Sequence, residues 1–322
     1  MKNSRRDTER SRHRTFLSAC LICGTLFLSI ALLATSAQAQ EETKAAPKEQ
    51  SGGDMGEIGK KLANPLGSVW ALNFNSFIPG FYDGNVNLND SELGATTIFQ
   101  PILPVPLRGE GKETSRVIMR PVIPLIWSTP IPEGFDDFDD QSGIGDIQLP
   151  FIFTVPDSIA GSWILGAGPV FEFPTATDDD LGADQWSAGP AIALGHKGKS
   201  LTAVLFFNYF SKIGSAGQDD DTPDTSKGTL LYSLQYALKD GWQVGTNPTI
   251  SYNDKATSGN KWNVPVGVFV GRTIKIGKVP VNIKLGVEYS VVRPDAFGQE
   301  AAVRLQVTPI IPSLIQNPIF GK

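Results

Sequence analysis

Clusters of carboxylates are the residues with the most evident chemistry in this sequence. Carboxylate oxygens are the ligands that Ca²⁺ and Mg²⁺ prefer. The spacing within the clusters does not match an EF-hand loop, so mutually repelling, solvated loops are the prediction and no metal site is assigned. Divalent-ion bridging is the alternative. The clusters fall in three segments: Asp136, Asp137, Asp139 and Asp140; Asp178, Asp179, Asp180 and Asp184; and Asp219, Asp220, Asp221 and Asp224.

Residues that could act as a nucleophile or a base are scarce. Cys20 and Cys23 lie in a segment that we expect to be removed, which leaves His196 as the only histidine. A Ser–His arrangement is improbable there, because His196 stands beside Lys197 in a predicted turn. No phosphate loop, zinc-ligand spacing or dinucleotide fingerprint occurs. The net charge of −5 argues against nucleic acid as a partner. The sequence therefore predicts no enzyme and no cofactor.

The first residues have the pattern of an export signal. A basic stretch at 5–14 precedes an apolar run at 16–34, and Ala37-Gln38-Ala39 is a small-x-small cleavage site. This pattern predicts a cleaved signal peptide over 1–39. An uncleaved helical anchor is the alternative, since the apolar run is just long enough to span a membrane. Residues 40–66 are polar, and we expect a periplasmic linker there with one helical turn near 56–63.

The rest of the chain, 67–322, is predicted to consist of alternating strands. Apolar and polar residues alternate with a period of two, which is typical of strands with two different faces. The mean hydropathy of −0.08 fits a barrel whose apolar outer face is balanced by a polar lumen. Twelve strands are predicted, at 68–77, 95–106, 116–127, 145–155, 162–173, 186–195, 201–211, 229–238, 242–252, 262–274, 279–292 and 300–311.

Period two alone does not separate a soluble sandwich from a membrane barrel, but tryptophan placement does. Six tryptophans stand at the ends of predicted strands, as in the aromatic girdles of outer-membrane barrels. Chance placement is the alternative. The prediction is an all-β, antiparallel, up-and-down transmembrane β-barrel of about twelve strands. The predicted girdle comprises Trp70, Trp127, Trp163, Trp186, Trp242 and Trp262.

Alternation also assigns residues to the lumen. In 279–291 the valines and Leu285 fall on the lipid face, and Lys284 and Glu288 fall on the other. The lumen charges are either structural ion pairs, such as Glu288 with Arg304, or a lining that filters solutes by charge. Phe206, Phe210 and Phe269 also point inward, where they either guide apolar solutes or fill the lumen. The predicted pore-lining residues are Arg120, Glu172, Asn208, Lys284, Glu288 and Arg304.

The connections alternate in length and charge. The longer ones, which we expect outside the cell, are 78–94, 128–144, 174–185 and 212–228, and the short basic ones include 196–199 and 275–278. One feature conflicts with a smooth cylinder, because prolines inside strands remove hydrogen-bond donors. These are Pro121, Pro150, Pro169, Pro190, Pro248, Pro265 and Pro309.

Several motifs are similar to those of one exported family. They are Asn64-Pro65-Leu66, Gly145-Asp146-Ile147, the 173–182 and 186–191 segments, Trp262 to Gly267, Lys278 to Asn282, and Arg293-Pro294-Asp295. The chain resembles, over about 64–311, the outer-membrane family named for the meta-cleavage pathway of phenol degradation. That resemblance implies an outer-membrane β-barrel and, loosely, transport. It implies no catalytic residues. The end of the chain, 312–322, departs from the terminal aromatic of most such barrels.

Two functions follow from these features. The first is a passive or gated channel for small solutes, hydrophobic or aromatic ones included. The alternative is a non-transporting structural or adhesive protein that uses its acidic loops. In either case the expected location is the bacterial outer membrane. The expected partners are outer-membrane lipid or lipopolysaccharide, the barrel-assembly machinery and, for a channel, a small-molecule solute.

Overall fold

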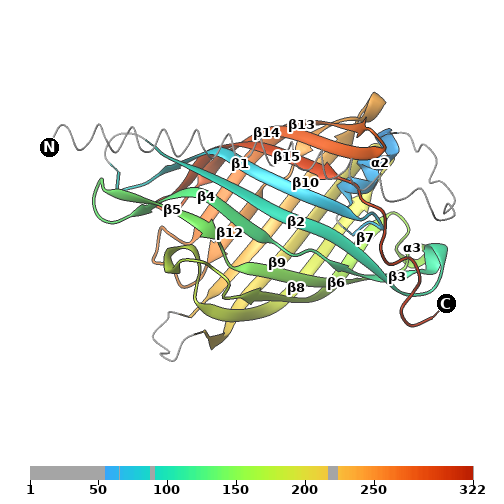
Figure 1. Ribbon diagram of the computed structural model, residues 1–322, viewed down its shortest axis with the longest axis horizontal. Helices are drawn as coiled ribbons and strands as arrows, with labels where there is room; N and C mark the ends of the chain where they lie inside the picture. Colours follow the sequence, from blue (N-terminus) through green and yellow to red (C-terminus); the bar gives the residue numbers. More distant parts are fainter. Residues whose placement is uncertain (1–54, 65, 88–90, 217–223, 322) are drawn as a thin grey trace. The chain divides into compact units, whose positions relative to one another are not determined.

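The structure is a computed structural model that describes residues 55–64, 66–87, 91–216 and 224–321. The predicted signal peptide, Asp219 to Asp221 and most of the predicted linker lie outside these residues. One sheet of fifteen strands closes on itself, because β1 pairs with both β2 and β15, and the named strand pairings are all antiparallel. Figure 1 shows the resulting barrel. None of the described helices is long and apolar enough to cross a membrane.

The fifteen strands make twelve barrel spans, which confirms the predicted number and fold class. Three spans are each divided in two: β3 with β4, β5 with β6, and β11 with β12. The strands are β1 (Ala71–Asp83), β2 (Glu92–Arg108), β3 (Ser115–Met119), β4 (Ile123–Pro132), β5 (Phe138–Ile144), β6 (Ile147–Thr154), β7 (Trp163–Phe173), β8 (Gln185–Lys197), β9 (Leu201–Ser215), β10 (Ser226–Ala237), β11 (Trp242–Thr246), β12 (Thr249–Asn253), β13 (Trp262–Ile276), β14 (Val279–Val292) and β15 (Gly298–Pro309).

Each division of a span leaves a polar residue out of the strand ladder. Arg120 precedes Pro121 between β3 and β4, Asn247 precedes Pro248 between β11 and β12, and Asp146 stands between β5 and β6. Proline lacks an N–H and restricts the residue before it, so the ladder cannot continue evenly through the first two of these points. The polar residues at the breaks are thus freed for contacts other than ladder hydrogen bonds.

Two further prolines are accommodated by facing each other. Pro169 of β7 lies directly opposite Pro190 of β8, and both are exposed on the outer surface. The glycine before each one lets the next strand approach. A Cβ on Gly168 would lie 1.9 Å from the carbonyl oxygen of Phe151, and one on Gly189 would lie 1.9 Å from that of Tyr209. This pairing explains how a closed barrel tolerates prolines inside adjacent strands.

The barrel has two different rims. At the short-turn rim, neighbouring strands are joined by brief connections such as 198–200 and 277–278. At the loop rim the connections are longer, but less so than predicted. The expected loop 128–144 is mostly strand, because β4 runs to Pro132 and β5 begins at Phe138. Polar residues such as Asp139 can pair in a ladder beyond the apolar band, where sequence alternation no longer marks a strand.

A helix and the end of the described chain lie at the short-turn rim. Helix α2 (Met55–Ala63) falls where one helical turn was expected, and its Leu62 packs against the core cluster. Residues at the end of the described chain pair with the last part of β2: the N–H of Phe320 donates to the Leu107 carbonyl at 2.8 Å, and that of Ile319 to the Pro106 carbonyl at 3.2 Å. The segment beyond β15 therefore continues the sheet along β2 where β1 no longer reaches.

Candidate functional site in the barrel lumen

The barrel encloses a cavity of about 420 Å³. Its lining begins near the short-turn rim at Leu62 and Ala63 of α2 and reaches Asn263 and Gln299 near the loop rim. The cavity therefore extends along most of the barrel, and its chemistry differs between two sides.

One side, which we call the polar wall, comes from β10 to β15 and β1. Its centre is Arg304, which forms an ion pair with Glu288 and donates from Nε to Asn75 Oδ1 at 2.8 Å. Arg304 Nη1 also donates to the backbone carbonyl of Asn247 at 3.0 Å. That carbonyl lies at the break between β11 and β12, so the proline that interrupts the span exposes an acceptor for the arginine.

Lys284 lies next along the polar wall. Its Nζ donates to Gln235 Oε1 at 2.9 Å and lies 4.5 Å from the ring centroid of Phe269. Among the described residues it forms no ion pair with a carboxylate. Gln235 also bonds to Gln243, and Asn282 donates to Thr273 at 2.9 Å, so the wall is an extended hydrogen-bonded surface.

The opposite side, which we call the apolar wall, comes from β2 to β9. Buried aliphatic and aromatic side chains cover most of it, and it continues into a core cluster at the short-turn end. Gln100, Gln148 and Asn208 are its polar exceptions. The apolar side chains on the cavity are Ile98, Ile102, Val122, Pro124, Pro150, Val170, Val204 and Phe206.

The predicted pore-lining residues all have their side chains inside the barrel. Arg120, Asn208, Lys284, Glu288 and Arg304 line the cavity. Glu172 is buried beyond the lining, where it pairs with Lys227 Nζ at 2.8 Å and accepts from Gln148 Nε2 at 3.0 Å. The roles of these residues in conduction stay predictions.

The predicted inward aromatics are also buried. Phe206 lines the cavity beside Phe269, whereas Phe210 is fully buried with Lys227 Nζ 5.9 Å from its ring centroid. The two interpretations of these rings therefore apply to different residues. Phe206 and Phe269 face solute space, and Phe210 fills the wall.

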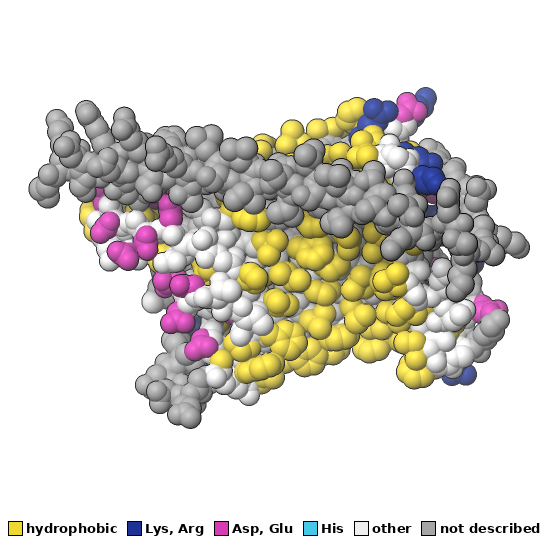
Figure 2. All heavy atoms as spheres, in the orientation of Figure 1, with side chains coloured by type: hydrophobic (Ala, Val, Ile, Leu, Met, Phe, Trp, Pro, Cys, Tyr) yellow, Lys and Arg dark blue, Asp and Glu magenta, His cyan; other side chains and the backbone are white. Residues whose placement is uncertain are grey.

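Four of the six predicted girdle tryptophans lie on the outer surface. Trp163 and Trp242 are exposed at the short-turn rim, and Trp186 and Trp262 at the loop rim. Between the rims Figure 2 shows a band of hydrophobic side chains, with Asp and Glu gathered at the left end, toward the loop rim. This arrangement has the form of a lipid-facing surface with an aromatic residue at each border.

The other two tryptophans correct the predicted girdle. Trp70 is only 6% exposed, and its indole N–H donates to the Pro104 carbonyl at 2.8 Å. Trp127 is half-buried and donates to Thr97 Oγ1, which also bonds to the buried Ser76. Strand-end position does not fix the direction of a side chain, and both indoles turn toward hydrogen-bond acceptors instead of lipid.

Asp146 anchors the loop between β7 and β8, a role that the sequence reasoning missed. Its carboxylate accepts from the N–H groups of Thr175 at 3.1 Å, Ala176 at 3.2 Å and Ala183 at 2.7 Å. Two of the motifs quoted above, Gly145-Asp146-Ile147 and the 173–182 segment, therefore meet in space. The acidic cluster at 178–184 lies on a loop that this single carboxylate holds at both ends.

A second contact at the loop rim joins the first and last spans. The guanidinium of Arg293 pairs with Asp83 at the end of β1 and with Glu300 of β15, the latter at 3.0 Å. The backbone of the same loop accepts from Asn85 through the Asp295 carbonyl at 2.8 Å. The Arg293-Pro294-Asp295 motif thus closes the seam between β1 and β15.

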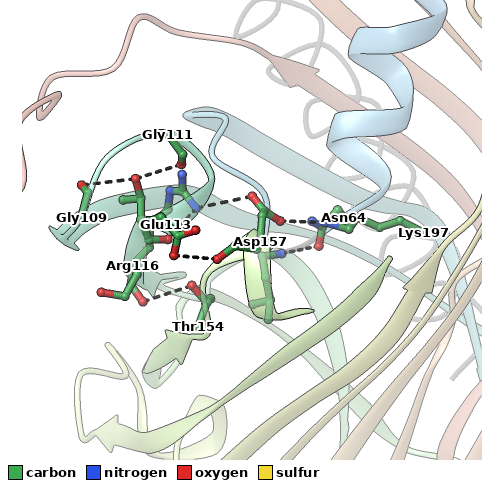
Figure 3. A network of polar contacts seen from close by, with 12 residues as sticks. Asn64, Gly109, Gly111, Glu113, Arg116, Thr154, Asp157 and Lys197 are labelled. Atoms are coloured by element: carbon green, nitrogen blue, oxygen red, sulfur yellow. Dashed lines mark hydrogen bonds and ion pairs between the residues drawn. The ribbon is translucent and has the colours of Figure 1, made fainter. Parts of the chain in front are cut away.

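At the short-turn rim a polar network joins three connections (Figure 3). Asp157, in the short helix α3 (Asp157–Ala160), pairs with Lys197 Nζ at 2.9 Å and lies 3.9 Å from Arg116 Nη1. Ser158 donates to Glu113 at 2.8 Å. These contacts connect neighbouring turns and leave the lumen charges untouched.

The described residues contain no group of three or more His, Cys, Asp or Glu side chains placed to hold a metal ion. His196 lies on the outer surface, where its ring meets that of Trp163 edge to face with 5.4 Å between the centroids. A histidine in this position serves the aromatic border of the barrel.

Fold, surface and lumen together define a transmembrane β-barrel of the outer-membrane type. A family model described as "MetA-pathway of phenol degradation" matches residues 93–292. That span is more than half of the chain, so the protein belongs to this family. The match is shorter than the 64–311 over which the motifs resemble it.

Solved structures share the barrel. An outer membrane channel from Pseudomonas putida F1 is 14% identical, with a TM-score of 0.53, and the match covers 83% of this chain and 99% of that one. The NanC porin is 8% identical, with a TM-score of 0.43 over 76% of this chain and 99% of that one. The Pseudomonas putida toluene transporter TodX is 8% identical, with a TM-score of 0.36 over 78% and 92%. None of the curated proteins compared with the chain matches it.

Proposed function

We propose that this protein is an outer-membrane channel that lets small solutes, hydrophobic and aromatic ones included, pass through the barrel. The observation that carries the proposal is the cavity of about 420 Å³, which extends along the barrel between a polar and an apolar wall. Clefts that pair apolar surface with a few placed polar groups are typical of small-molecule sites. The shared fold with an outer membrane channel supports the same function.

The apolar wall argues for solutes with an apolar body. A purely hydrophilic pore gains nothing from buried rings and aliphatic side chains, whereas Phe206 and its neighbours remove apolar solute surface from water. The polar wall supplies hydrogen bonds along the same path. A flat molecule with one polar edge satisfies both walls at once.

Liposome swelling tests the proposal directly. Purified protein in liposomes should admit small aromatic solutes such as benzyl alcohol and benzamide faster than protein-free liposomes, and it should give discrete single-channel currents. Folded protein that passes no solute and no ions would contradict the channel. The structural or adhesive alternative, which relies on the acidic loops, would then be favoured.

The orientation in the membrane has its own test. Short turns of outer-membrane barrels face the periplasm and long loops face outside, so we propose that the loop rim is extracellular. Protease added to intact cells should cleave between Asp219 and Lys227 and spare His196 to Lys199. Equal cleavage of both segments in intact cells would contradict this orientation.

A further inference from the structure

Arg120 is a buried charge without a counter-charge. It is 6% exposed and lines the cavity at the break between β3 and β4. Its Nη2 donates to Gln100 Oε1 at 3.0 Å, but its buried Nε and Nη1 have no hydrogen-bond partner. No carboxylate among the described residues forms an ion pair with it. An isolated guanidinium is costly to bury, because it stays charged and loses its water.

The geometry leaves one complete fork of donors open. A guanidinium has five N–H bonds arranged along its edges, and Nη2 contributes to two of those edges. Gln100 accepts only one bond from Nη2, so another edge keeps both of its N–H groups. A carboxylate accepts two parallel bonds from such an edge. The unfilled positions therefore match a planar anion better than a neutral acceptor.

The surroundings of Arg120 specify the rest of the ligand. Its guanidinium carbon lies 5.5 Å from the ring centroid of Phe206, and Val122 and Val170 line the same cavity. Such surfaces bury an apolar body beside the charge, which a hydrated inorganic anion does not need.

The balance of charge along the cavity also favours an anion. Three cationic side chains, Arg120, Lys284 and Arg304, line it against the single carboxylate of Glu288 among the described lining residues. Arg304 is paired with Glu288, so Arg120 and Lys284 both present uncompensated charge. An entering anion meets favourable charge on both walls.

We infer that Arg120, backed by Phe206 and the apolar wall, is a binding subsite for the carboxylate of small aromatic or apolar monocarboxylates. This inference rests on the proposed channel function and narrows it to a solute class. The carboxylate would complete the guanidinium's hydrogen bonds, and the ring or chain would lie against the apolar wall. No bond is made or broken, so the site selects solutes and does not transform them.

Benzoate and its neutral analogue benzamide provide the test. Calorimetry on the detergent-solubilised full chain should show benzoate binding that weakens about tenfold or more in Arg120→Met, as expected for the loss of hydrogen bonds to a charged group. In liposomes, Arg120→Met should slow benzoate influx and change benzamide influx by less than about twofold. Arg120→Lys should bind benzoate with intermediate affinity, because a lysine keeps the charge but not the fork.

Arg116→Met is the matched control, since Arg116 lies on β3 just before Arg120 but belongs to the short-turn network outside the cavity. It should leave both solutes unchanged. Heat-modifiable gel migration checks that each variant is folded. Equal handling of benzoate and benzamide by wild type and Arg120→Met, in binding and in influx, would overturn the inference and leave the channel standing. Benzoate binding that depends on Arg120 without influx of either solute would keep the subsite and overturn the channel.

Discussion

The polar and apolar walls of the lumen are built from strands with the same outer face. On β14 the outward residues Leu285 and Val287 are exposed, and on β8 so are Ile192 and Leu194. Inside, β14 presents Lys284 and Glu288, whereas β8 presents small residues such as Ala191 and Ala193. Lipid sets the same demand all round the barrel, so only the inward positions are free to differ. The division of the lumen is therefore where function is encoded.

The largest expected effect concerns the shared outer face. Leu285→Arg and Ile192→Arg should each destabilise the folded state by about 2–4 kcal/mol in bilayers, because both place a charge on the lipid-facing middle of a strand. Urea titration of liposome-folded protein measures the loss. Lys284→Ser, one residue from Leu285 but inside, should be much milder. A tolerated Leu285→Arg with a lethal Lys284→Ser would mean that the register of β14 is wrong by one residue.

Same-shape substitutions test the difference between the walls. Val204→Thr adds a hydroxyl to the apolar wall, and Thr273→Val removes one that accepts from Asn282 in the polar network. Each should cost about 1–3 kcal/mol, since the first buries an unpaired hydroxyl and the second leaves an amide unpaired. The same urea titrations report both. A neutral Val204→Thr would show that water reaches the apolar wall.

Ion selectivity separates charges on the cavity from charges behind it. Glu288→Gln should shift the reversal potential of reconstituted channels toward anions in a salt gradient, because it leaves Arg304 without its carboxylate. Glu172→Gln is the matched control, as Glu172 is buried beyond the cavity lining and paired with Lys227. Equal shifts in both variants would show that the selectivity does not arise at the polar wall.

The smallest effect is expected at α2, which covers the end of the polar wall. Glu57 and Lys61 form an ion pair at 3.3 Å, with both side chains more than half exposed. Such pairs contribute about 0.3–0.5 kcal/mol. Lys61→Ala should change stability by no more than this and leave ion selectivity as in wild type. A selectivity change would show that the outer surface of α2 belongs to the conduction path.

The sequence predicts the strand number and the two faces well, for a physical reason. Period two is imposed by lipid on every span, so alternation alone assigns Leu285 and Lys284 to opposite faces. The division of the lumen is not predictable in this way. It depends on which inward residues meet across the barrel, as Arg120 at the end of β3 meets Phe206 of β9, and that is fixed only by closure.

The span breaks do carry a signal in the sequence. Arg120-Pro121 and Asn247-Pro248 each place a polar residue before a proline inside a predicted strand. Such pairs mark points where the ladder fails and a polar group is released into the lumen. The direction of Trp70, in contrast, depends on the carbonyl of Pro104 in a neighbouring span, and local sequence carries no signal for it.

The Arg293 contact has a consequence for the order in which the barrel assembles. The seam between β1 and β15 joins the two spans that are farthest apart in the chain, so closing it restricts more of the polypeptide than any other strand pairing. Until it forms, both spans present unpaired backbone edges that invite pairing with other chains. Arg293 acquires Asp83 and Glu300 together only when those edges meet, which makes it a latch whose engagement marks completion of the barrel.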